Sequence, residues 1–115
     1  MRPIVFQENV SLAAGQTINN ALEQSRLVQS PMDGFLSLAI NGSAVGLRVQ
    51  MIVGSDEVVT DSAVNGFNRS IEEDKDFLLR RIGTRAGERV TLKISNPTAG
   101  ALTADLRVLL RPVRG

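Results

Sequence analysis

The stretch that decides the fold is residues 87–112, GERVTLKISNPTAGALTADLRVLLRP. Apolar and polar residues alternate in both halves, and successive side chains of a β-strand point to opposite faces. Between the halves, residues 96–100 contain Pro97, which cannot extend a strand ladder, and Gly100, which accommodates a turn. We expect Asn96 to Gly100 to form an exposed loop. The stretch therefore predicts a β-hairpin with one face in the core and one face in solvent. The residues predicted to lie in the core are Leu92, Ile94, Leu106 and Val108.

Four segments before this stretch are also predicted strands, of which 35–40 is nearly all apolar. They are residues 3–12, 35–40, 45–53 and 77–82, with Asn41-Gly42 as the predicted hairpin turn between the second and third. Residues 16–30 are interpreted as mostly extended, with a helical turn over 17–25 as the alternative. Six to eight short strands without a long helix predict an all-β fold. We expect a single antiparallel β-sandwich domain over residues 1–115, jelly-roll-like in its topology.

The composition excludes several kinds of active site. The 115 residues include no cysteine, histidine, tryptophan or tyrosine, and only four phenylalanines. A histidine or thiolate metal site, a cysteine nucleophile and a Ser-His-Asp triad are therefore absent. Paired carboxylates could still hydrolyse a glycoside, but nothing in the sequence places two of them across a cleft. We expect a protein that is not an enzyme and that uses no cofactor.

The apolar runs of the sequence are short. No apolar run approaches the length of about 18 residues that a membrane-spanning helix needs. The first ten residues, MRPIVFQENV, lack the apolar core of a signal peptide. We expect synthesis in the cytoplasm and no membrane partner.

Charge is distributed unevenly along the chain. Residues 1–76 carry five basic and ten acidic groups, whereas residues 77–115 carry eight basic and two acidic groups. Arginine favours bidentate pairing with carboxylates, so acidic and basic surfaces of neighbouring protomers are predicted to meet. The predicted interface residues are Arg80, Arg81, Arg107, Leu109 and Arg111 on one side, and Glu72, Glu73, Asp74 and Asp76 on the other.

Each of these clusters has a second interpretation. The arginines would keep a sheet face soluble or, as the less favoured partner, contact nucleic acid. If residues 90–95 and 102–111 pair, Arg89 and Lys93 would extend the basic surface. The carboxylates at 72–76 are oxygen ligands suited to Ca²⁺, but their spacing does not match an EF-hand loop. An exposed, solvated loop over residues 60–76 is the favoured interpretation.

Three segments together resemble a known class of proteins: SPMDGFLSLAINGS at 30–43, the polar residues 60–76, and AGERVTLKISNPTAGALTADLRVLL at 86–110. They resemble small β-sandwich virion proteins, namely phage capsid decoration proteins and single-jelly-roll shell proteins. The resemblance implies a structural virion component that forms a homo-oligomer, a trimer or larger, or binds a capsid protein. The alternative is a non-enzymatic carbohydrate- or small-ligand-binding β-sandwich module, cytoplasmic if not viral. The missing tryptophan and tyrosine deprive this alternative of the usual stacking platforms for sugars.

Overall fold

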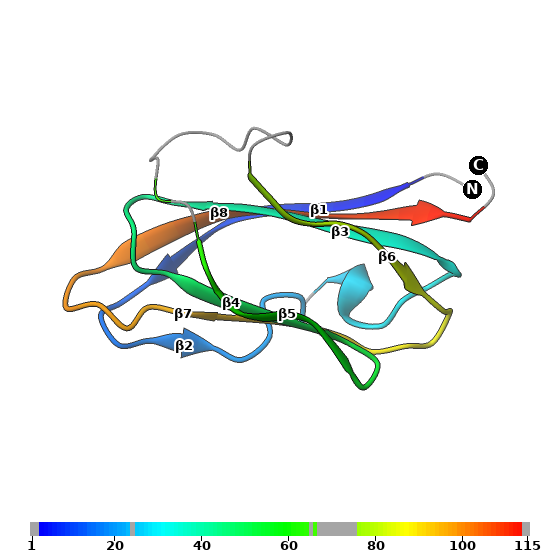
Figure 1. The fold of residues 1–115 in the computed structure, drawn as a ribbon, viewed down its shortest axis with the longest axis horizontal. Helices are drawn as coiled ribbons and strands as arrows, with labels where there is room; N and C mark the ends of the chain where they lie inside the picture. The colour runs from blue at the N-terminus through cyan, green and yellow to red at the C-terminus, as the bar shows by residue number, and fades with distance from the viewer. Residues whose placement is uncertain (1–2, 24, 65, 67–75, 114–115) are drawn as a thin grey trace.

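The computed structural model describes residues 3–23, 25–64, 66 and 76–113, which form two four-stranded antiparallel sheets packed face to face (Figure 1). The first sheet has the order β1 (Ile4–Leu12), β8 (Leu102–Pro112), β3 (Gly34–Gly42), β6 (Phe77–Thr84). The second has the order β2 (Thr17–Ile18), β7 (Val90–Ser95), β4 (Arg48–Val53), β5 (Asp56–Ala63). A single-turn 3₁₀ helix, η1 (Arg26–Val28), lies between β2 and β3.

The strands interleave between the two sheets. Apart from β4 and β5, every pair of strands consecutive in the described chain lies in opposite sheets. An eight-stranded double sheet with this order has the topology of a jelly roll. The predicted all-β, antiparallel, jelly-roll-like sandwich is therefore confirmed.

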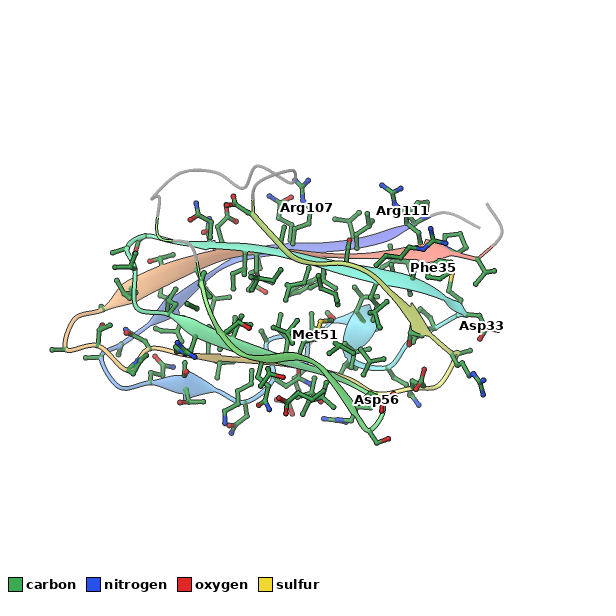
Figure 2. The ribbon with its side chains drawn as sticks, in the orientation of Figure 1. Asp33, Phe35, Met51, Asp56, Arg107 and Arg111 are labelled. Atoms are coloured by element: carbon green, nitrogen blue, oxygen red, sulfur yellow. The ribbon has the colours of Figure 1, made fainter. Side chains whose placement is uncertain are left out.

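The core lies between the sheets and is built from the alternation seen in the sequence. In β8 every second residue from Ala104 to Leu110 is fully buried, and β7 contributes Val90, Leu92 and Ile94 from the opposite sheet. Met51 of β4 points into the same layer (Figure 2). Leu92, Ile94, Leu106 and Val108 are each 0% exposed, which confirms the predicted core positions.

The two predicted hairpins around this core are wrong. β7 and β8 belong to different sheets: β8 pairs with β1 and β3, whereas β7 pairs with β4 and β2. The β3–β4 connection after Asn41-Gly42 also crosses between the sheets, and Val45 in it is 76% exposed, so the strand begins at Arg48. A strand–turn–strand pattern is the same for a hairpin and for a connection across the core, because both strands turn an apolar face inward in either case.

The chain does form a tight hairpin between β4 and β5. Val53 pairs with Asp56, so only Gly54 and Ser55 lie between the two strands. Gly54 has a φ of 63°, in the left-handed region that a two-residue turn requires and glycine adopts without strain.

The predicted exposed loop over residues 60–76 is wrong for most of its described part. Strand β5 continues to Ala63, and Val64 is buried. Asp76 is 1% exposed directly before β6. Most of the remaining positions, Glu72, Glu73 and Asp74 among them, lie outside the described residues.

Gly34 at the start of β3 occupies a position without room for a side chain. It pairs with Thr84 of β6 and with Pro112 of β8, and an added Cβ would overlap the carbonyl oxygen of Arg111. Gly34→Ala is expected to lower the free energy of unfolding by about 1–3 kcal/mol, measured by denaturant unfolding.

Gly83→Ala is the matched control on the neighbouring strand. A Cβ added at Gly83 meets no atom within 4 Å. The free energy of unfolding of this variant should therefore lie within about 0.5 kcal/mol of the wild-type value, or slightly above it. Equal losses in the two variants would contradict the close approach of β8 to Gly34.

Candidate functional site

The outer face of the first sheet carries basic and apolar side chains side by side. In β8 the residues that alternate with the buried positions include Asp105, Arg107, Leu109 and Arg111, and Figure 2 shows both arginines pointing away from the second sheet. The antiparallel register places Phe35 of β3 opposite Arg111 and Ser37 opposite Leu109. Consequently the outer side chains of two neighbouring strands form one continuous surface.

A groove lies on this face across β8, β3 and β6. It encloses about 370 Å³, within the range of about 300–1,000 Å³ that is usual for small-ligand sites. The lining residues are Phe35, Ser37, Arg81, Leu109, Arg111, Pro112 and Val113. The groove thus combines two guanidinium groups and a hydroxyl with an apolar wall.

Arg81 of β6 is held against Phe35. Its Cζ atom lies 3.9 Å from the centroid of the phenylalanine ring, within the range of a cation–π contact. This contact favours a position of the guanidinium over the ring, where it covers one face of Phe35. The exposed Arg81 therefore forms one side of the groove and Arg111 another.

Arg107 lies further along β8, beyond the groove. Its Nη2 atom donates a hydrogen bond of 2.9 Å to Oε1 of Gln7, the residue opposite it in β1. Arg107 is therefore a half-buried part of the sheet face rather than part of the groove lining.

The structure brings together part of the predicted interface. Arg81, Leu109 and Arg111 line one groove, and Arg107 lies on the same sheet face. Asp76 is buried and so offers no carboxylate on the protein surface. The side chain of Arg80, like Glu72, Glu73 and Asp74, lies outside the described part of the chain.

Two features of this face differ from the sequence interpretation. Arg89 and Lys93 do not extend the basic surface, because β7 belongs to the other sheet. Phe35 and Ser37 were missed as groove residues because the segment 35–40 was interpreted only as an apolar strand. Their signal was the alternation with Leu36, Leu38 and Ile40, which are all buried.

The second sheet also has a groove of similar volume on its outer face. It encloses about 380 Å³ and is lined by Thr17, Arg48, Val49, Gln50, Lys93 and Ser95. Its lining is almost wholly polar, since Val49 itself is 1% exposed. The groove on the first sheet is the better candidate because it offers apolar surface as well as charge.

The described residues offer neither a cluster of metal ligands nor a membrane-spanning helix. Within them, no three carboxylate, histidine or cysteine side chains come together as metal ligands would. The described residues also contain no helix with the length and apolar character needed to cross a membrane.

Comparison with known proteins finds similar folds among solved structures. No family model and no curated protein matches the sequence. One similar solved structure is the C-terminal CBM6 of LamC, a marine laminarinase from Zobellia galactanivorans, with 12% identity and a TM-score of 0.46 over 94% of this chain and 90% of that one. Another is PliG of Salmonella Typhimurium, a periplasmic inhibitor of g-type lysozyme, with 10% identity and a TM-score of 0.40 over 95% and 87% of the two chains. With both scores below 0.5, neither likeness bears on the function of this chain.

Proposed function

We propose that this protein is a non-enzymatic β-sandwich module that binds a small polar ligand, a saccharide, in the groove on the first sheet. The observation that carries the proposal is the lining of that groove: Leu109, Pro112 and Val113 supply apolar surface beside the donors of Arg81 and Arg111. A sugar ring needs this combination, because it presents C–H groups on its faces and hydroxyl groups around its edge.

Binding without turnover fits the side chains that line the groove. None of the described lining residues is a carboxylate, so the lining does not supply the acid and base of glycoside hydrolysis. The composition also provides no histidine or cysteine for catalysis. We therefore propose recognition alone as the activity of this site.

The groove is also built on a rigid surface. Three of its lining residues belong to β8 and two to β3, which pair along nine consecutive residues, and Arg81 is held by Phe35. Strand pairing already fixes the backbone that carries these side chains, so binding requires little further ordering of the backbone.

The test is to titrate the protein with a panel of neutral and acidic oligosaccharides and to follow backbone amides by NMR. We expect shifts confined to amides around Phe35, Arg81 and Leu109, with those around Lys93 on the other sheet unchanged. Leu109→Ala should weaken binding by removing part of the apolar wall, while the control Lys93→Gln should not. If no saccharide binds, or if the shifts map to the second sheet, the proposal is wrong.

The virion role implied by the sequence resemblance remains a prediction, as do its homo-oligomeric or capsid partners and its location. These expectations concern assembly, and the proposal of a ligand groove does not depend on them. A mass measurement of the native protein tests them separately.

A further inference from the structure

We infer, on the basis of the proposed function, that the groove selects a saccharide bearing carboxylates, such as a uronate oligomer, over a neutral one. The inference concerns which chemical group of the ligand supplies most of the affinity. Its grounds are the unneutralised charge of the groove, the covered ring of Phe35 and the position of the groove on a sheet face.

The groove carries positive charge that the described residues do not neutralise. Arg81 and Arg111 both line it, and the described part of the chain gives neither of them a carboxylate partner. The nearby carboxylate of Asp33 is directed elsewhere, since its Oδ1 atom accepts a hydrogen bond of 2.8 Å from the backbone N–H of Ala86. Two guanidinium groups beside a partly apolar wall favour an anionic ligand, and carboxylates pair with guanidinium in a bidentate geometry.

The contact between Arg81 and Phe35 disfavours the usual way of binding a neutral sugar. Neutral sugars commonly stack on an aromatic ring, but here the guanidinium already covers one face of Phe35. At 3.9 Å from the ring centroid the Arg81 Cζ atom is close enough for the guanidinium to stack on the ring, and the N–H donors of a stacked guanidinium lie in its own plane. The edge of the Arg81 side chain can therefore donate to a carboxylate without breaking the stack.

The location of the groove favours a saccharide over an acidic peptide. Peptides that bind to sheets commonly add a strand at an exposed edge, where backbone groups are unpaired. Most of this groove lies on a face: β8 and β3 below it both have strand neighbours on their two sides, and only Arg81 comes from the edge strand β6. Recognition there must come from side chains, which suits a compact ring with a carboxylate and hydroxyl groups.

The experiment compares uronate oligomers with their carboxyl-reduced counterparts, which differ only in the charged group. Calorimetric titration of the full chain should show the uronate binding at least about tenfold more tightly, as expected for hydrogen bonds to a charged group. The affinity should fall as salt is raised, because partly exposed ion pairs are screened. Arg81→Gln and Arg111→Gln should each weaken uronate binding about tenfold. Each should weaken binding of the neutral oligomer by a clearly smaller factor, because glutamine keeps a hydrogen-bond donor but loses the charge.

Lys93→Gln is the control, since it removes the same charge from the outer face of the other sheet. An equal loss of uronate affinity in Lys93→Gln would overturn the inference by showing attraction through net charge. Equal affinity of the wild type for the charged and neutral oligomers would also overturn it, while the proposed function would stand. Failure to bind any saccharide would overturn the proposed function itself. Tighter binding of poly-glutamate than of every uronate would assign the groove to an acidic peptide.

Discussion

Leu106→Ala is expected to lower the free energy of unfolding by about 2–5 kcal/mol. Leu106 is 0% exposed and lies in β8 between Glu8 of β1 and Ile40 of β3, with its side chain in the layer between the sheets. Truncation removes buried methyl groups and leaves a cavity that two paired strands cannot close. Denaturant unfolding should show a lower midpoint with an unchanged slope.

Leu109→Ala on the same strand is the matched comparison. Leu109 points to the outer face and is half-buried. Its truncation should therefore lower the free energy of unfolding by about 1 kcal/mol, roughly half the transfer free energy of a fully buried leucine. The two variants should also separate by function: Leu109→Ala weakens ligand binding, whereas folded Leu106→Ala protein binds normally. Equal losses of stability in the two variants would show that the inner and outer faces of β8 are assigned wrongly.

The faces of the strands were predictable from the sequence because side-chain alternation is a local property. The alternation in residues 102–111 separates Leu106 and Val108 from Arg107 and Leu109 without any knowledge of the fold. The same rule correctly placed Leu92 and Ile94 in the core. Fold class followed from the number of such strands and the absence of a long helix.

Strand pairing was not predictable in the same way, because it depends on contacts between distant residues. The predicted hairpin over residues 87–112 has a suitable pattern and turn, but β8 pairs with β1, about 100 residues away, and with β3. Two long neighbours let β8 form hydrogen bonds along both sides, which a hairpin with the six-residue β7 could not provide.

Only the part of the candidate site that lies within one strand was predictable from the sequence. Leu109 and Arg111 share a strand face, so their proximity is visible in the sequence. The contact of Arg81 with Phe35 joins residues 46 positions apart, and it exists because β6 pairs with β3. The sequence therefore indicated a basic surface with an exposed leucine, but not the groove that the three strands form.

Asn96→Ala is expected to lower the free energy of unfolding by roughly 2–4 kcal/mol, since buried polar groups left unsatisfied cost about 1–3 kcal/mol each. Asn96 was predicted to lie in an exposed loop, but it is 1% exposed at the crossing from β7 to β8. Its Nδ2 atom lies within hydrogen-bond distance of three backbone carbonyl oxygens, those of Leu12 at 3.2 Å, Ala13 at 3.2 Å and Gly100 at 2.8 Å. Its Oδ1 atom accepts from the backbone N–H of Thr98 at 3.1 Å and from the Thr98 hydroxyl at 2.6 Å.

These contacts make Asn96 the link between the crossing and the chain that follows β1, so its removal should loosen both. Asn96→Asp tests the donors specifically, because it keeps the acceptor for Thr98 but turns an oxygen toward the three carbonyl groups. We expect this variant to be at least as destabilised as Asn96→Ala, since the buried oxygen has no N–H to donate. Asn19→Ala, at an exposed position, is the control and should change stability by no more than about 0.5 kcal/mol. An Asn96→Ala protein as stable as this control would mean that the crossing is held by the strands alone, and the buried amide would then have no structural role.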